Sequence, residues 1–308
     1  MNSIAGSAAA LERPRKRLGD YVQALLPKVV LGPTLLCALI FVYGFILWTA
    51  WLSFTESRLL PRYELAGFVQ YVTLFANERW WTALSNLAIF GGLFIAVCLI
   101  TGLLLAILLD QRIRAEGFLR AIYLYPMALS FIVTGTAWKW ILNPGLGLQH
   151  LVRQWGFESF TFEWIVTPGM SIYAVVLAGA WQSSGFVMAL FLAGLRGVDD
   201  SIIKAAQVDG ASPVRIYTII IIPSLRPVFF SALIILAHIA IKSFDLVMAL
   251  TGGGPGFSSD LPATFMYTFA FNRNQIGLGA ASAMMMLMTV VAIIVPLIYS
   301  ETRRHRRG

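Results

Sequence analysis

Residues 80–109 decide the fold; they read WWTALSNLAIFGGLFIAVCLITGLLLAILL, and no Asp, Glu, Lys or Arg interrupts them. About 20 consecutive apolar residues in a helix cross the ~30 Å hydrocarbon core of a bilayer, so this stretch is long enough for a membrane span. Its apolar residues follow one another without the period-two alternation of a membrane barrel strand. Because a helix satisfies its own backbone hydrogen bonds within lipid, we expect a transmembrane helix here.

Further stretches of the chain also lack charged residues over lengths that matter for a bilayer. They are residues 29–55, 121–138, 164–195, 227–241 and 274–300. The stretch 121–138 contains Pro126. The stretch 227–241 is short, but a helix from about Ser224 to Leu250 would span if Lys242 and Asp245 are tolerated within it. The chain is therefore predicted to be an all-α integral membrane protein with six transmembrane helices.

The composition excludes a soluble globular protein. Apolar residues make up 58% of the chain and charged residues 12%, against about 45–50% and about 25% in soluble domains. The chain has 2 Cys and 3 His, and none of them shows the spacing of metal ligands. We therefore expect no metal site on this chain.

The basic residues are distributed unevenly between the two sides of the predicted bundle. Most Lys and Arg lie before the first span, in the second and fourth connections, and after the sixth span. Basic segments tend to stay in the cytoplasm, so both termini are predicted to be cytoplasmic. The formal net charge of +8 then reflects topology and anionic lipid rather than nucleic-acid binding. The expected parts are a cytoplasmic N-terminal tail at 1–28, a membrane domain at 29–300 with a long cytoplasmic loop at 196–227, and a basic cytoplasmic tail at 301–308.

The long cytoplasmic loop contains residues 197–223, which read GVDDSIIKAAQVDGASPVRIYTIIIIP. Residues 199–201 supply an N-cap and acids for the first turn of a helix. Gly210 suits the left-handed position that ends this helix, and residues 212–213 form the N-cap and first residue of a second helix, which Pro223 interrupts. The first helix is expected to expose Ile202, Ala205 and Ala206, a surface of little bulk that another protein could approach closely.

This segment resembles the signature loop of ABC importer permeases, which has Glu-Ala-Ala, three residues, Gly, nine residues and Ile-x-Leu-Pro. The spacing is kept in full, and the residues that carry it or extend it are Lys204, Ala205, Ala206, Asp209, Gly210, Ala211, Ile220 and Pro223. The form Ala-Ala-x-x-Asp-Gly-Ala is similar to that of carbohydrate permeases of the maltose and glycerol-phosphate class. Over residues 29–300 the chain most resembles permeases of glucose/mannose-type importers.

The resemblance implies a type I ABC importer permease fold and a set of partners. The signature loop would form a coupling helix seated in a cleft of an ATPase subunit. This chain has no G-x-x-x-x-G-K-[ST] sequence, so ATP and Mg would bind the partner ATPase and this chain would be a transport subunit, not an enzyme. The implied assembly contains a second permease as heterodimer partner, two ATP-binding cassette subunits and an extracytoplasmic sugar-binding protein, in a bacterial inner membrane.

Two features of the sequence admit two interpretations each. Lys204 stands where the family usually has Glu, either as a tolerated surface change or as a change matched in the ATPase. Lys242 and Asp245 lie three residues apart, on one face of the predicted fifth helix, where ionisable groups are costly. They form either a self-neutralising pair that fixes the bundle or hydrogen-bonding contacts to a sugar.

The resemblance also implies a path for the sugar along the fourth and fifth spans. Phe186 could stack on the apolar face of a sugar ring, while Gln182 and Ser183 bond its hydroxyl groups. The residues expected on this path are Gly179, Gln182, Ser183, Phe186, Ile239, Lys242, Ser243 and Asp245. Glucose or a related aldohexose is the predicted substrate, and another polyol or an oligosaccharide is the alternative substrate. The alternative function is that of an autonomous secondary carrier.

The predicted outer connections, residues 56–79 and 139–169, are rich in Trp and amphipathic in places. Short interfacial helices are expected from Phe75 to Trp81 and from Trp155 to Trp164, as membrane-surface anchors or as a docking face. The Gly- and Pro-rich residues 251–259 predict a turn at the outer surface. The resemblance places the docking of the substrate-binding protein at this turn.

Overall fold

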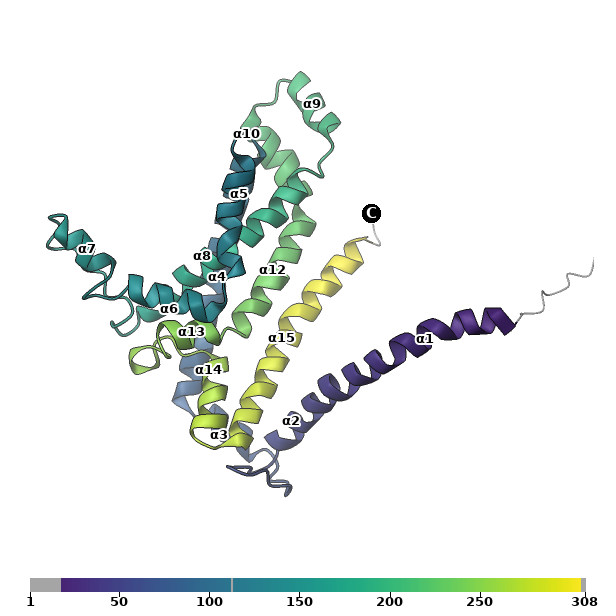
Figure 1. The fold of residues 1–308 in the computed structure, drawn as a ribbon, viewed down its shortest axis with the longest axis vertical. Helices are drawn as coiled ribbons and strands as arrows, with labels where there is room; N and C mark the ends of the chain where they lie inside the picture. The colour runs from purple at the N-terminus through teal and green to yellow at the C-terminus, as the bar shows by residue number, and fades with distance from the viewer. Residues whose placement is uncertain (1–17, 112, 306–308) are drawn as a thin grey trace, which may run out of the picture. The chain divides into compact units, whose positions relative to one another are not determined.

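The computed structural model describes residues 18–111 and 113–305, and all regular elements within these ranges are helical (Figure 1). An isolated bridge between Thr55 and Leu65 accompanies them without forming a strand. The chain divides into two units, residues 1–49 and residues 50–308. The prediction of an all-helical chain is confirmed for the described residues.

The first unit is a long apolar helix. Helix α1 covers Leu18–Ala38, a π-helical turn η1 covers Leu39–Gly44, and α2 covers Phe45–Ser53 and so continues into the second unit. Residues 28–49 are mostly exposed in this unit, and a helix that is apolar all round suits lipid. The candidate span Lys28–Ser53 confirms the first predicted span. Residues 1–17 of the predicted tail lie outside the described residues.

The second unit is built on three long helices: α4 (Glu78–Asp110), α8 (Ser171–Leu195) and α15 (Ile276–His305). Helices α4 and α8 share the largest contact in the unit, because small residues let them approach. A Cβ atom on Gly102 of α4 would meet the Val187 side chain of α8. Each of the three helices contains a stretch that can cross a membrane, as the runs at 80–109, 164–195 and 274–300 predict.

The predicted third span is broken. Helix α5 (Glu116–Leu124) and the 3-10 turn η2 (Tyr125–Ala128) are followed by α6 (Phe131–Ile141), and the two halves meet at an angle of 101°. Leu129 is extended between them, and the Ser130 hydroxyl accepts a hydrogen bond from the Val133 N–H to start the new helix. The prediction of one continuous helix over 121–138 is therefore wrong, because Pro126 and the Ser130 cap end one helix and begin another.

The predicted fifth span is also bent and lies earlier in the chain. Helix α10 (Pro213–Ile216), the π-helical turn η3 (Tyr217–Ile221) and α11 (Ile222–Ser224) meet α12 (Arg226–Ile241) at 62°. The break falls at Leu225, after Pro223 rather than at it, and α12 begins with a Pro in its first turn. The expected helix from Ser224 to Leu250 is wrong, since α12 ends at Ile241 and α13 is a separate helix, Asp245–Leu250.

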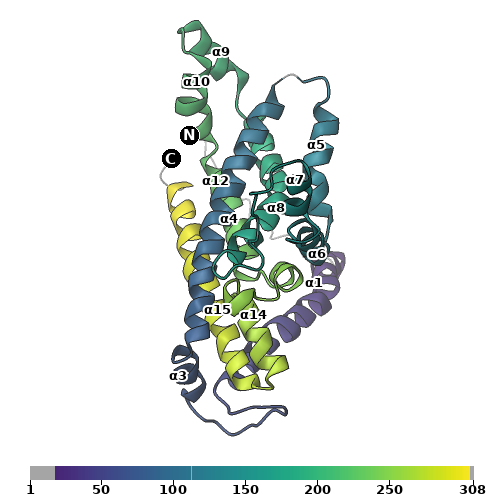
Figure 2. The ribbon, with the colours of Figure 1, turned by 90° about the vertical axis from the view of Figure 1, so that its left-hand side faces the viewer.

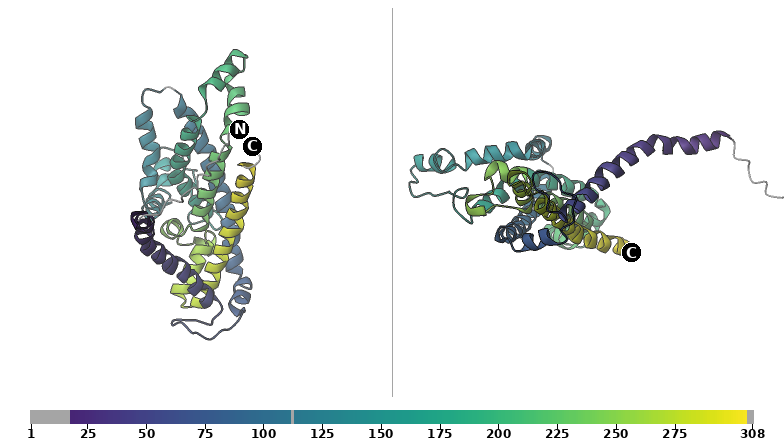
Figure 3. Two further views of the ribbon diagram at one scale, coloured as in Figure 1. Left: turned by 90° about the vertical axis from the view of Figure 1, so that its right-hand side faces the viewer. Right: turned by 90° about the horizontal axis from the view of Figure 1, so that it is seen from below.

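Shorter elements lie toward the two ends of the second unit. Helix α9 (Asp200–Val208) lies at one end, and α3 (Val69–Phe75) lies at the other with α14 (Pro262–Tyr267) nearby (Figures 2 and 3). Helix α7 (Leu148–Gln154) lies in the connection between α6 and α8. The predicted interfacial helices, Phe75 to Trp81 and Trp155 to Trp164, are misplaced. Helix α3 ends at Phe75 and α7 ends at Gln154, so each helix ends about where the prediction had one begin.

The described helices include four that are long and apolar enough to cross a membrane, or six spans if each bent pair counts as one. The six predicted spans thus correspond to six segments, two of which are broken. In a bilayer, a broken helix leaves backbone groups without intrahelical partners. The residues packed around such a break are therefore placed to bond these backbone groups.

Candidate functional site

The α9–α10 hairpin has the local structure that its sequence predicts. The Asp199 carboxylate accepts a hydrogen bond of 2.8 Å from the Ser201 N–H and caps α9. Gly210 has φ of +75°, which favours glycine at the end of a helix. The Ser212 hydroxyl accepts from the Arg215 N–H at 3.4 Å and caps α10, whose first residue is Pro213. Two capped helices thus enclose a fixed turn.

The hydrogen bond at the N-terminus of α9 also lowers the pKa of the Asp199 carboxyl. The backbone N–H of Ser201 stabilises the ionised carboxylate of Asp199 and holds the pKa of that carboxyl below its usual range. Asp199 therefore remains a charged cap at neutral pH.

The hairpin presents an apolar crest, to which three residues contribute most. Ile202 is 50% exposed, Val208 is 88% exposed and Val214 is 72% exposed. Ala205 is exposed as predicted, but Ala206 is buried against the bundle, which corrects the predicted surface. Val208 and Val214 were not predicted, although Ile202, Ala205 and Val208 follow the three-residue spacing of one helix face.

The remaining residues of the signature lie at or beside this crest. Lys204, Asp209 and Gly210 are exposed. Ala211, Ile220 and Pro223 are half-buried. Ala206 and Ala211 pack with the main apolar cluster of the unit. The hairpin is therefore attached through Ala206 and Ala211 together with the buried Ile216, and it exposes Lys204 and Asp209.

A charge cluster joins three helix ends beside the hairpin. The Arg196 guanidinium lies 2.7 Å from the Glu116 carboxylate and 3.9 Å from that of Asp110. These residues come from the end of α8, the start of α5 and the end of α4. The sequence shows only separate loop charges here, so the cluster could not be predicted from it.

The predicted sugar-path residues of α8 lie inside the unit. Gly179, Gln182 and Ser183 are buried, and the Gln182 Nε2 atom donates a hydrogen bond of 2.7 Å to the carbonyl of Leu129 at the break in the third span. The Gln182 Oε1 atom is buried and has no hydrogen-bond partner. Because a buried unpaired acceptor is costly, this atom is suited to receive a hydrogen bond from a bound group.

The predicted path residues near the fifth span lie on different elements. Ile239 belongs to α12, Lys242 is its C-cap, Ser243 is in the break, and Asp245 begins α13. Lys242 and Asp245 are both exposed, and no ion pair joins them among the salt bridges of the described chain. The interpretation as a self-neutralising pair on one helix face is therefore wrong, because the helix ends between the two residues.

The second half of the broken third span packs against the short helix that follows the fifth span. Helix α13 packs closely on α6, and a Cβ atom on Gly135 would meet both the Ala249 side chain and the Leu246 carbonyl. Gly179 of α8 also adjoins Leu246, and Phe186 is half-buried against the main apolar cluster. Of the predicted path residues, Gln182 thus lies at the break in the third span and Gly179 adjoins α13. Lys242, Ser243 and Asp245 lie where α12 ends and α13 begins.

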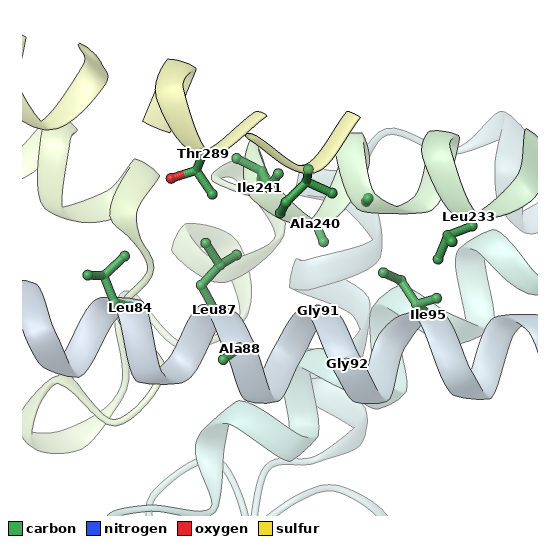
Figure 4. A pocket seen from close by; sticks show the side chains of 12 residues that line it. Leu84, Leu87, Ala88, Gly91, Gly92, Ile95, Leu233, Ala240, Ile241 and Thr289 are labelled. Atoms are coloured by element: carbon green, nitrogen blue, oxygen red, sulfur yellow. The ribbon is translucent and has the colours of Figure 1, made fainter. Parts of the chain in front are cut away.

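A strongly apolar hollow of the unit lies elsewhere. A groove of about 420 Å³ runs between α4, α12 and α15 and is lined by Leu84, Leu87, Ala88, Gly91, Gly92, Ile95, Leu233, Ala237, Ala240, Ile241, Thr289 and Ile293 (Figure 4). Thr289 supplies its one polar side chain. A sugar needs many hydrogen-bonding groups, so this groove suits hydrocarbon and not a sugar.

A polar network fixes the turn after α13. The Arg79 guanidinium lies 2.7 Å from the buried Asp260 carboxylate and 4.3 Å from the centre of the Phe257 ring. The Asn86 amide donates to the carbonyls of Phe257 and Asp260. Phe257 itself has φ of +65°, a left-handed conformation that is costly for a residue with a ring. The predicted turn at 251–259 is confirmed, and these contacts hold it against α4.

Over residues 18–111 and 113–305, no group of three or more His, Cys, Asp or Glu could hold a metal ion.

Comparison with known proteins agrees with this arrangement. The model of the family described as the inner membrane component of binding-protein-dependent transport systems matches residues 98–304. The chain is 37% identical over 278 residues to a probable ABC transporter permease of Pyrococcus horikoshii, covering 89% of this chain and 95% of the relative. It is 36% identical over 267 residues to the xylose/arabinose import permease of Haloferax volcanii, covering 85% and 84%.

A third relative and a solved structure extend the comparison. The trehalose/maltose transport system permease of Thermococcus litoralis is 30% identical over 290 residues, covering 93% of this chain and 96% of the relative. The crystal structure of a bacterial ABC transporter that imports alginate contains a chain with a TM-score of 0.81 and 20% identity, covering 93% of this chain and 99% of that one. The fold is thus that of a type I importer permease, and the chain belongs to the family of inner membrane components of binding-protein-dependent transport systems.

Proposed function

We propose that this chain is the permease subunit of an ABC importer that carries a sugar across the inner membrane of a bacterium. The observation that carries the proposal is the α9–α10 hairpin, in which the signature spacing coincides with a capped, rigid turn at Gly210. Its exposed crest, formed by Ile202, Val208 and Val214, suits a cleft in another subunit. Both termini and this hairpin would face the cytoplasm.

The proposed assembly supplies what this chain lacks. Two ATP-binding cassette subunits would bind ATP and Mg, and one of them would receive the hairpin. A second permease would complete the path as a heterodimer partner, and an extracytoplasmic sugar-binding protein would deliver the substrate. A solved structure similar to this chain in fold was determined with a binding protein that holds an alginate pentasaccharide, which supports the last of these partners.

The proposed substrate is a sugar, with glucose or a related aldohexose first. Two relatives are named for xylose/arabinose and for trehalose/maltose. Gln182 offers an unpaired acceptor at the break before α6. Lys242 and Asp245 are exposed between α12 and α13, so that donors and acceptors for several hydroxyl groups are present. Phe186 would provide an apolar ring for stacking.

The test of the proposed function is purification of a tagged chain from its native membrane in mild detergent, followed by mass identification of its partners. ATPase activity is then measured with the purified binding protein and candidate sugars. Recovery of a second permease and an ATPase, with hydrolysis stimulated by one loaded sugar, would support the proposal and name the substrate. Recovery of a lone chain that still moves solute would favour an autonomous carrier instead, and stimulation by an oligosaccharide or another polyol alone would replace the aldohexose.

The path residues have a separate test in the reconstituted transporter. Gln182→Ala or Asp245→Ala is expected to lower sugar uptake while assembly with the ATPase stays intact, because each removes a group available to the sugar. Glu64→Ala, which removes an exposed acid far along the chain, serves as the control. Loss of assembly in either path variant would show that the residue is structural.

The role of Lys204 is tested by exchange with the family's usual residue. If the lysine is a tolerated surface change, Lys204→Glu leaves ATP-driven uptake unchanged, because the residue is exposed. Loss of uptake, with recovery when the facing residue of the ATPase is exchanged, would instead identify a matched pair.

A further inference from the structure

The last two residues of α6 and most of the connection to α8 form an arm, residues 140–166, that contains α7. Helix α7 stands away from the long helices of the unit (Figure 1). The Asn143 side chain accepts hydrogen bonds from the N–H groups of Gly145 and Leu146 at the start of the arm. Phe162 and Trp164 pack ring to ring, with centroids 4.7 Å apart, on its return. The arm is therefore a folded element, although it lies away from the long helices.

Helix α7 is amphipathic, but in the reverse sense to a surface helix. Leu148, Leu151 and Trp155 lie on one face by their spacing, and they are 38%, 44% and 69% exposed. Away from this face, Gln149 is only 4% exposed, while His150, Arg153 and Gln154 are exposed. A helix at a protein–water boundary turns its apolar face inward, whereas α7 turns that face outward.

The polar face of α7 is bonded within the arm. The Gln149 Oε1 atom accepts a hydrogen bond from the Phe162 N–H, and the Arg153 Nε atom donates to the carbonyl of Phe160 at 2.8 Å. The side chains of His150 and Gln154 lie 3.0 Å apart and bond to each other. The arm thus bonds Gln149, His150, Arg153 and Gln154 internally, which lowers the cost of placing these side chains away from water.

The outward apolar surface extends beyond α7 in both directions along the chain. Trp140 is 72% exposed, Leu146 is 85% exposed and Phe157 is 65% exposed. None of the hydrogen bonds found in the described chain involves the indole N–H of Trp140 or Trp155. A ring with a free N–H at one edge suits the boundary between acyl chains and headgroups, where Trp is enriched.

The course of the chain places this surface beside the membrane. Helix α6 continues a span but turns by 101° from its first half, so it runs across the direction of that half and not along it. The arm follows directly from α6, whose Ile132 and Val133 are also exposed. The unbroken spans require a bilayer around them, and this bilayer would also surround the arm. A helix that lies in the plane of a bilayer buries its apolar face in the lipid.

We propose that the arm is a membrane-surface anchor: α7 lies in the lipid boundary with Leu148, Leu151 and Trp155 among the acyl chains and headgroups. The Lys139 ammonium, exposed at the end of α6, meets lipid phosphate groups. The anchor fixes the outer half of the broken third span against the bilayer. This inference requires the membrane position of the chain and is independent of the sugar it carries.

The test uses single cysteines with an environment-sensitive fluorophore in the assembled transporter, reconstituted into phosphatidylcholine nanodiscs. Cys37 is exposed and is first replaced by Ser, while buried Cys98 is kept. The labelled variants are Leu151→Cys and Trp155→Cys on the apolar face, and the matched controls are His150→Cys and Gln154→Cys on the polar face of the same helix. Quenching is measured with nitroxide-labelled lipid and, separately, with iodide in the water.

Labels at positions 151 and 155 are expected to be quenched by the lipid nitroxide several-fold more strongly than those at 150 and 154, with the reverse order for iodide. Equal quenching by iodide at all four positions would overturn the proposal by placing the face in water. Quenching by neither reagent at 151 and 155 would also overturn it, because the face would then be covered by the second permease. Leu151→Cys removes a smaller side chain than Trp155→Cys and keeps the test valid if the tryptophan variant fails to fold. Neither readout involves transport, so it stays separate from the test of the proposed function.

Discussion

Replacement of Gly210 tests whether the conformation of the turn, and not its composition, makes the hairpin work. Gly210 has φ of +75°, and a Cβ atom at this position would meet nothing within 4 Å of the chain. A substitution therefore causes no clash within the subunit and acts through the backbone alone. A non-glycine residue held in this region costs on the order of 1–3 kcal/mol.

Gly210→Val is the strongest form of the change, because a branched side chain rarely adopts a positive φ. A cost of about 2 kcal/mol lowers the population of the native turn relative to other turns by a factor of about 30. Asn adopts the left-handed region several times more readily than other residues of its size, so Gly210→Asn is the matched control. Gly210→Val is expected to lose most ATP-driven uptake, and Gly210→Asn to keep much of it.

The assay is uptake by the transporter reconstituted in liposomes, together with ATPase activity and the amount of ATPase subunit that co-purifies. Uptake by Gly210→Val at the rate of the unchanged protein would refute the requirement for a left-handed turn. Equal losses in the Val and Asn variants would refute the conformational reasoning in a different way, since bulk at the docking surface would then be the cause.

Three further predictions follow from contacts elsewhere in the chain. Arg79→Ala leaves the Asp260 carboxylate, whose side chain is 1% exposed, without its counter-charge, and is expected to destabilise the protein by about 3–5 kcal/mol; thermal unfolding in detergent measures this, and Arg79→Ala with Asp260→Asn should recover part of the loss. Gly185→Ala places a Cβ atom on a backbone carbonyl of α5 and is expected to reduce the folded protein in the membrane, whereas Gly92→Ala, which meets nothing within 4 Å, should not; equal yields would contradict the tight packing of α5 on α8. The lowered pKa of Asp199 stabilises α9 above the ordinary carboxyl pKa of about 4, and this stabilisation is lost as the pH falls through the lower folded value; hydrogen exchange of α9 should therefore quicken at acid pH, and Asp199→Asn, which keeps a cap without a charge, should remove that dependence.

The sequence predicted the local structure of the α9–α10 hairpin well, because its determinants are local. A cap such as Asp199 bonds to an N–H two residues away, and Gly210 adopts its conformation through its own backbone freedom. The same local information could not show that Ala206 is buried and Val208 exposed. That difference depends on which side of α9 meets the bundle, and the bundle is formed by distant residues.

The sequence was less informative about the candidate path. It predicted Lys242 and Asp245 to share a helix face, because their spacing fits a helix and nothing between them breaks one. The structure ends α12 at Ile241 and starts α13 at Asp245. Helix α13 packs on α6, and this packing between segments far apart in the sequence accompanies the break.

What the sequence by itself determined is the membrane character of the chain and the number of its apolar segments. The cost of burying a charge or an unpaired backbone group in lipid acts on each segment separately, so it can be read from composition. Only the tertiary structure decided the direction of those segments: the 101° bend in the third span, the 62° bend in the fifth and the outward apolar face of α7. Hydropathy records how apolar a segment is and not where it points, and direction is set by contacts between residues that the sequence keeps apart.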